Sequence, residues 1–424
     1  NAYNVGVGYS AGSAITTGQE NVFIGALSGD STTDADGNVG VGHRTLDANT
    51  LGQFSTAIGG LALASQNYTT ATNAYNVAVG YGAGSLISTG IQNTLIGSAV
   101  GDALTDADFN VAVGYAALDK DTKGSKSTAI GTNALFNQNF TTATDSHNVA
   151  VGYNAGLSVT TGLRNTFAGG ESGDATNTGD DNTFIGYAAG GAHTTSDDNT
   201  ALGSFALTGA VTGAANTGIG RSSLAAVTSG ANNTGLGYLA GNSITTGGGN
   251  TCIGKGSDTN SASRNNSIAI GQEVTVSADN RVTIGSGSNI ASLELDGSDT
   301  SWAASSDERL KENITDSTAG LSFINDLRPV TYNWKKAKDV PNDLPQYIDG
   351  SDDPCLGYEY GTELHGFIAQ EVKTVIDNHS EVKDGQAIWL TDETTVQTLA
   401  PAALIPMLVK AIQELTARVA ALES

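Results

Sequence analysis

A five-residue motif, Asn/Ser-Thr/Val-x-Ile/Val-Gly, recurs over the first two thirds of the chain and constrains the fold more than any other feature. Its copies begin at residues 4, 21, 38, 55, 76, 93, 110, 127, 148, 165, 182, 199, 216, 233, 250, 267 and 281. Thirteen of the sixteen steps are 17 residues, two are 21 and the last is 14. A fixed period of this length is typical of a solenoid, in which each repeat is one coil stacked on the next.

Alternation within the motif predicts a short strand with two apolar faces. The second position is mostly Thr or Val, the fourth is almost always β-branched, and the third is Ala, Gly, Phe or Leu. We therefore expect the strand to be buried on both faces, with the Thr in the core and the small residues facing neighbouring chains. We also expect a shorter return strand in each coil, as at 85–89. The first position predicts a ladder of stacked Asn side chains at residues 165, 182, 199, 216, 233 and 250.

Composition changes near residue 300. All six prolines and all three tryptophans lie after it, whereas 49 of the 55 glycines lie before it. We therefore expect a β-solenoid shaft over residues 1–300 and a separate domain over residues 301–424. Because residue 1 is Asn, we expect the native N-terminus, with any attachment domain, to lie outside this sequence.

The charge of the chain limits its partners. A net charge of −24 argues against nucleic acid and anionic membrane surfaces, because both attract basic proteins. No run of 18 apolar residues is present, so membrane insertion is not expected. Acidic turns at 33–37, 105–109 and 195–199 lack the ligand series of an EF-hand loop. We expect no metal and no cofactor.

Three motifs follow residue 300 in order: SSDERLKENI (305–314), LRPVTYNWK (327–335) and HGFIAQEV (365–372). Taken alone, the first predicts the start of a helix, with Ser305 and Glu308 in a capping box. We expect His365, in the third motif, to have a packing role in the folded domain.

The last helix, from Pro401, carries apolar residues in steps of three and four, which is typical of the seam of a parallel coiled coil. The alternative is a single amphipathic helix packed on its own domain. The seam residues are Ile405, Leu408, Ile412, Leu415, Val419 and Leu422.

Over roughly residues 4–285, the repeat resembles the left-handed β-roll heads of trimeric autotransporter adhesins and the similar shafts of phage tail fibres. That resemblance implies a homotrimer. The periodicity alone implies only that the coils stack and that the shaft packs against some partner. The three C-terminal motifs together resemble the peptidase S74 family, the intramolecular chaperone of phage tail fibres and tailspikes, over about residues 303–424.

The second resemblance implies two activities. The block would bring three chains into register so that the fibre can fold, and would then cut itself off once, before the Ser of its S-D-x-R-L-K motif, with a Ser–Lys dyad. The matching catalytic residues are Ser306 and Lys311, and the bond is Ser305–Ser306. The extra Ser305 leaves an ambiguity of one residue in the position of the cut.

We therefore expect an all-β fibre: a trimeric, left-handed β-roll shaft of 17-residue coils, followed by a small α+β chaperone domain that ends in a coiled-coil helix. The expected function is a structural virion protein, a phage tail fibre or spike assembled in the host cytoplasm. Its expected partners are two copies of itself, a host surface glycan or protein, and other tail proteins bound through the missing N-terminus. The alternative is a bacterial trimeric surface adhesin. A glycan-cleaving enzyme would need paired acids in an aromatic-lined groove, and the sequence shows none.

Overall fold

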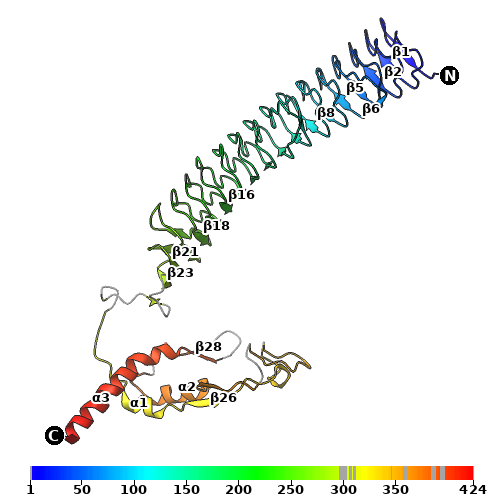
Figure 1. Cartoon of the computed structure of the whole chain (residues 1–424). Coiled ribbons are helices and arrows are strands. Elements are labelled where there is room, and N and C mark those ends of the chain that lie inside the picture. The colour runs from blue at the N-terminus through cyan, green and yellow to red at the C-terminus, as the bar shows by residue number, and fades with distance from the viewer. Residues whose placement is uncertain are drawn as a thin grey trace. The chain divides into compact units, whose positions relative to one another are not determined.

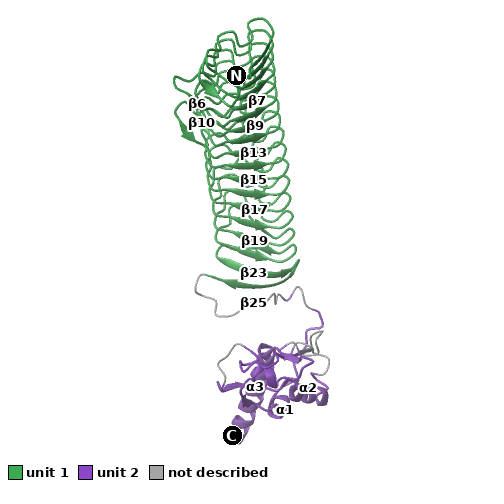
Figure 2. Cartoon of the chain, turned by 90° about the vertical axis from the view of Figure 1, so that its right-hand side faces the viewer, with its two compact units in different colours: residues 1–305 green, residues 306–424 purple. Residues whose placement is uncertain are grey.

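The computed structural model describes residues 2–295, 303–304, 308, 312–344, 346–356, 361–382, 388–391 and 397–423. The chain divides into two compact units, residues 1–305 and residues 306–424 (Figure 2). Each unit is described by itself.

The first unit is a β-solenoid, as the repeat predicts. Short strands stack in parallel, one per coil, from β1 (Val5–Val7) near the N-terminus to β23 (Arg281–Ser286) (Figure 1). The strands between them are β2 (Val22–Ile24), β3 (Val39–Val41), β5 (Thr56–Ile58), β7 (Val77–Val79), β8 (Thr94–Ile96), β9 (Val111–Val113), β11 (Thr128–Ile130), β13 (Val149–Val151), β14 (Thr166–Ala168), β15 (Thr183–Ile185), β16 (Thr200–Leu202), β17 (Thr217–Ile219), β18 (Thr234–Leu236), β19 (Thr251–Ile253) and β21 (Ile268–Ile270).

The strands pair in the register of the repeat. Thr166 lies opposite Thr183, one 17-residue step away, and Ile58 lies opposite Val79 across a 21-residue step. The additional residues of the longer steps therefore lie outside the main ladder. Each insertion ends in a lateral parallel pair, β4 (Gly52–Gln53) with β6 (Thr72–Asn73) and β10 (Gly124–Ser125) with β12 (Thr144–Asp145). A third lateral pair joins β20 (Asp258–Thr259) to β22 (Thr275–Val276).

The predicted return strand at 85–89 is wrong, because this segment is a series of turns. Gly84, directly before this segment, has a φ of 57°. The chain then bends, and the Ile87 side chain is fully buried in the core. Backbone hydrogen bonds still join it to the next coil, as from the Ser88 N–H to the Thr105 carbonyl at 2.8 Å.

The prediction of which strand face points into the core of the coil is also wrong. The third motif residue, such as Ala78 or Phe167, points into the coil and is fully buried, whereas the second and fourth residues point outward. A coil of 17 residues encloses a narrow core, so small side chains occupy most inward positions. Phe23 fits because its neighbour on the next coil is Gly40, where an added Cβ would lie 2.9 Å from the ring.

The outward face consequently carries an apolar row along the whole shaft. Its fourth-position residues are about two-fifths exposed on many coils, as at Ile24 (40%), Ile96 (40%) and Ile185 (38%), and half-buried on others, such as Val41 and Val79. The second-position Thr residues, expected in the core, are half-buried on this same outward face. A single chain therefore leaves one side of its sheet without apolar cover.

The predicted Asn ladder is confirmed. The Asn182 Oδ1 atom accepts a hydrogen bond from the Asn199 backbone N–H at 3.0 Å, and its Nδ2 atom donates to the Ser196 carbonyl at 2.9 Å. Five of the six predicted Asn side chains make both bonds, whereas the Asn199 Nδ2 atom donates to the Asp197 carbonyl at 2.9 Å. All six side chains are fully buried. The coil that begins with Ser55 has no Asn at the ladder position. There the Gln66 side chain takes its place, and its Oε1 atom accepts a hydrogen bond from Asn76 Nδ2 at 2.9 Å.

The parallel stack ends in an antiparallel edge. β23 turns back into β24 (Asn289–Glu294), which pairs in turn with β25 (Ala303–Ala304). The last described strand of the first unit therefore lies within two residues of the boundary between the units.

The described part of the second unit combines three helices with two antiparallel strand pairs. The helices are α1 (Leu321–Asp326), α2 (Ala369–Asn378) and α3 (Ile405–Glu423), with the 3₁₀ turns η2 (Ala337–Asp339) and η3 (Pro401–Leu404). The strand pairs are β26 (Val330–Tyr332) with β27 (Leu364–Gly366) and β28 (Trp389–Thr391) with β29 (Gln397–Leu399). Their shared core contains Ala319, Phe323, Leu327, Val372, Ile376, Val382, Ile388 and Leu404.

The Asn ladder yields a stability prediction. Replacing Asn182→Ala leaves a buried N–H and a buried carbonyl without partners, so we expect the free energy of unfolding to fall by about 2–3 kcal/mol. Asn73→Ala is the control, because Asn73 is exposed and makes one long bond, to the Tyr75 hydroxyl at 3.3 Å; its effect should stay within about 0.5 kcal/mol. Thermal and denaturant unfolding measure both variants, and equal shifts would show that the ladder carries no special stability.

Candidate functional site

The residues predicted to cleave the chain lie outside the described residues. This applies to Ser305, Ser306 and Lys311, and it also applies to most of the predicted helix start at 305–314. The geometry of the second unit therefore rests on the elements that follow, and the dyad stays a prediction from the sequence.

Helix α3 is tied to α1 on one face. The Glu414 Oε2 atom accepts a hydrogen bond from the backbone N–H of Leu321, the first residue of α1, at 2.9 Å. The approach is close, because a Cβ added to Gly320 would lie 2.7 Å from the Glu414 carboxylate. On the same side, Ala411 is buried and Met407 packs against the core. This face fixes the direction of α3.

A second face of α3 is apolar and open in the single chain. The predicted seam residues are all exposed, by 42% at Leu408, 63% at Ile412 and 87% at Leu422. Val409 adds to the same exposed surface at 49%. Soluble single chains rarely leave a continuous apolar row uncovered, so this face is a candidate contact surface. The coiled coil itself remains a prediction, because it requires further chains.

His379 joins the end of α2 to α1 by two ionic hydrogen bonds. Its Nε2 atom lies 2.8 Å from Asp326 Oδ2, and its Nδ1 atom lies 2.8 Å from Glu381 Oε1. The ring also packs edge-on against Phe323 in the core, with the centroids 5.4 Å apart. Both carboxylates favour the imidazolium, Asp326 most strongly, and so raise the pKa of His379; His379 in turn lowers the pKa of Glu381.

Arg328 and Glu371 form a second link between the region after α1 and helix α2. The Arg328 Nε atom donates to Glu371 Oε2 at 2.9 Å, and a second guanidinium nitrogen donates to the other carboxylate oxygen. This paired bond lowers the pKa of Glu371. Both side chains are exposed, so the link orients the elements more than it stabilises them.

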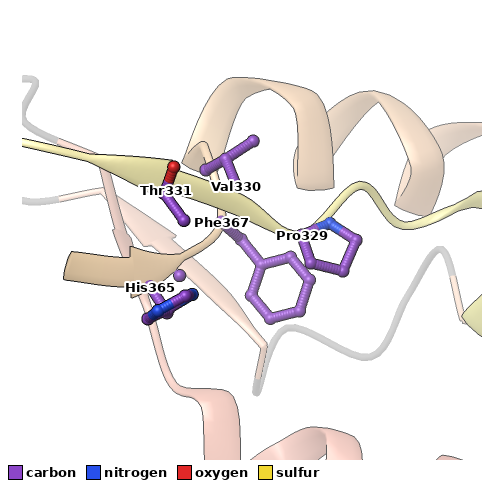
Figure 3. Close-up of a pocket in the computed structure, with 6 residues that line it drawn as sticks. Pro329, Val330, Thr331, His365 and Phe367 are labelled. Carbon is purple, nitrogen blue, oxygen red and sulfur yellow. The ribbon is translucent and has the colours of Figure 1, made fainter. Parts of the chain in front are cut away.

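A shallow pocket of about 390 Å³ opens beside the β26–β27 pair. Figure 3 shows Pro329, Val330 and Thr331 along one strand, and His365 and Phe367 along the other. Thr331 lies directly opposite His365 in the antiparallel pair. His365 is exposed here, so its predicted packing role is wrong: alternation along β27 places this side chain on the solvent side.

The acidic turns of the shaft bind backbone rather than gather into a cluster. Asp36 accepts from the Gln19 N–H at 2.7 Å, and Asp108 accepts from the Ile91 N–H at 2.8 Å, each one coil back. Among the described residues, no three His, Cys, Asp or Glu side chains come together as a metal-binding group. In the same part of the chain, no helix has the length and apolar character needed to cross a membrane.

The His379 cluster and the Glu414 contact were not found from the sequence. Asp326 and His379 are 53 residues apart, and Leu321 and Glu414 are 93 residues apart. None of these spacings belongs to a local motif, and only the packed unit brings the side chains together.

Comparison with protein families identifies the C-terminal block. Residues 306–381 match the family described as the chaperone of endosialidase, Peptidase S74. The resemblance drawn from the three motifs is thereby confirmed, and together with the β-solenoid shaft it is consistent with a phage tail fibre or tailspike. Neither the search of curated proteins nor the search of solved structures finds a match.

The His379 cluster yields a pH prediction. Because the pKa of His379 is raised in the folded unit, its stabilisation is complete below about pH 6.5 and is lost as the pH rises through the folded-state pKa. His379→Gln should therefore lower the melting temperature of the second unit by a few degrees in mild acid, and by progressively less in alkaline solution.

Tryptophan fluorescence in a Trp302→Phe background measures this unit selectively, since the other two tryptophans of the chain, Trp334 and Trp389, both lie in it. His365→Gln is the matched control and should leave the melting temperature unchanged. A His379→Gln effect that does not depend on pH would contradict the ionic role.

Proposed function

We propose that the chain is a virion fibre, a phage tail fibre or spike, whose C-terminal unit assembles three chains and then releases itself by autoproteolysis. The observation that carries the proposal is the open apolar face of α3 in a unit whose sequence matches a chaperone family. The fibre is assembled in the host cytoplasm and meets a host surface receptor.

The shaft supports assembly from several copies. Its outward β-branched row runs from coil to coil in the register of the sheet, so a second and a third copy offer the same row at the same repeat. Three chains around one axis bury these rows together, which a single thin coil does not do. The proposed assembly is a trimer in which each shaft coils in the left-handed sense.

The C-terminal unit brings the three chains together and aligns them, which the shaft cannot do by itself. Each coil pairs with the coil one repeat away, but three copies also have to meet in the same register, and until they do their outward apolar rows stay exposed. Joining three α3 seams first raises the local concentration of the three shafts and aligns their ends. The bond from Glu414 to the start of α1 holds α3 so that its seam faces outward.

Cleavage follows from a Ser–Lys dyad. The Ser306 hydroxyl attacks the carbonyl carbon of Ser305 while the Lys311 amine takes the hydroxyl proton. The peptide nitrogen leaves as the amine of Ser306, and water then converts the ester to a carboxylate at Ser305. Lys311 acts as a base when its pKa falls from about 10.4 towards neutral, through burial between chains or nearby positive charge.

The position of the bond agrees with the rest of the chain. The two compact units divide between residues 305 and 306, and the family match begins at residue 306. β25, at Ala303–Ala304, pairs with β24 on the shaft side of this boundary. A cut at Ser305–Ser306 therefore releases the second unit and leaves the last strand of the shaft paired.

The cleavage prediction is tested by intact mass. Wild-type chain should yield a fragment of 119 residues (424 − 305) that begins at Ser306. Ser306→Ala and Lys311→Ala should remain at full length. The control is Ser317→Ala, which changes a nearby Ser outside the motif and should cut normally. A full-length mass in every sample would exclude autoproteolysis and leave the unit as a permanent cap.

The assembly prediction concerns the seam. Leu415→Asp places a charge in the proposed three-chain contact, so we expect loss of the trimer and at least a tenfold slower release of the fragment, on the order of 1.4 kcal/mol or more. Gln413→Asp adds the same charge to an exposed position of α3 outside the seam and should assemble normally. Sedimentation and intact mass give both readings, and a trimeric Leu415→Asp variant would exclude the seam.

A further inference from the structure

We propose that a row of exposed tyrosines along the shaft is a binding surface for an extended, neutral glycan. The row occupies the position directly after the motif glycine, where every second coil carries Tyr81, Tyr115, Tyr153 or Tyr187. These residues are exposed by 65%, 61%, 56% and 51%, respectively. The coils between them carry Ser98, Thr132 and Gly170 at this position. The inference rests on the proposed fibre function, in which the shaft meets a host surface.

The spacing of the rings suits a polysaccharide. Neighbouring coils are about 4.8 Å apart, so rings on alternate coils are about 9.6 Å apart. A disaccharide of an extended β-linked polysaccharide has about the same length, and such a chain turns the same sugar face to one side once per disaccharide. Each ring therefore meets an equivalent sugar face.

The rings stand on a rigid backbone. Each tyrosine carbonyl accepts a hydrogen bond from the next coil: Ala99 N to Tyr81 O at 2.9 Å, Asn133 N to Tyr115 O at 3.0 Å and Glu171 N to Tyr153 O at 2.8 Å. Tyr187 also lies against the preceding coil, where a Cβ on Gly170 would be 3.6 Å from its ring. A surface ordered before binding loses less conformational freedom when the ligand arrives.

Polar groups lie beside the rings. Directly after the ring position, three consecutive coils between Tyr115 and Tyr187 carry Asn133, Asn154 and Glu171. The Asn133 Nδ2 atom donates a hydrogen bond to Asn154 Oδ1 at 3.1 Å. A sugar presents C–H groups on its faces and hydroxyl groups around its rim. Flat rings next to amide and carboxylate groups match both parts.

The charge of the row selects a neutral ligand. From Tyr81 to Tyr187, neither the ring position nor the residue after it is Lys or Arg, and Glu171 adds a negative charge. The whole chain carries −24, so a polyanionic glycan would be repelled.

The row also differs from the surface assigned to neighbouring copies. The outward strand face is apolar on every coil, whereas the tyrosine row alternates with Ser, Thr and Gly. The alternation leaves separate rings with small residues between them, which favours repeated ligand contacts over continuous apolar packing.

Binding is tested on the intact fibre by calorimetry. The probes are hexasaccharides of β-1,4-linked glucose and of β-1,4-linked N-acetylglucosamine, the matching disaccharides, and a hexamer of β-1,4-linked mannuronate as the acidic probe. At least one neutral hexasaccharide should bind roughly tenfold or more tightly than its disaccharide, because it spans three rings. The acidic hexamer should not bind.

The variants locate the site. Tyr115→Ala, Tyr153→Ala and Tyr187→Ala combined should weaken hexasaccharide binding roughly tenfold or more. Tyr9→Ala is the matched control: Tyr9 has the same repeat position and is 77% exposed, but the coil two steps on carries His43 instead of Tyr. Its binding should equal that of the wild type.

Three results would overturn the proposal: no binding of either neutral hexasaccharide, equal binding by the triple variant, or tighter binding of the acidic hexamer. Dissociation of the fibre in the triple variant but not in Tyr9→Ala would also overturn it, since the rings would then be a contact between copies. The mass of the released fragment, measured on the same samples, reports separately on the proposed self-cleavage.

Discussion

Hydrogen bonds between residues one repeat apart hold the shaft together, and its other features depend on their register. Strand pairs such as Thr166 with Thr183 place identical positions above one another, so the Asn side chains also stack. Asn182, for example, accepts from the Asn199 N–H, 17 residues on, and donates to the Ser196 carbonyl, 14 residues on, so that buried polar groups of the narrow core have partners. The same register aligns the outward apolar row and the tyrosine row.

The narrow coil also leaves an apolar row on the outside of the shaft. Small side chains occupy most third positions of the strands inside the coil, and the mostly β-branched fourth-position residues lie on the outward face. In the proposed assembly, contacts between copies would cover this row, and a separate unit with an open apolar helix face would bring the copies together in register.

Within the second unit, a few long-range polar contacts set the geometry. Glu414 binds the start of α1 and leaves the seam of α3 facing outward, while His379 joins α1 to the end of α2 through two carboxylates. The unit thus holds one apolar surface open while its own core is closed. Both carboxylates favour the protonated form of His379 and so raise its pKa, which makes this link sensitive to pH.

Sequence alone determined the features that recur at a fixed spacing: the solenoid, the Asn ladder, the terminal helix and the family of the C-terminal block. Each depends on local periodicity or on a short motif, which a single chain displays directly. Only the tertiary structure decided which face of the strand is inside, because that depends on the width of the closed coil. It also decided that Asp326 meets His379 and that Glu414 meets Leu321, since side chains distant in sequence become neighbours only after the unit packs.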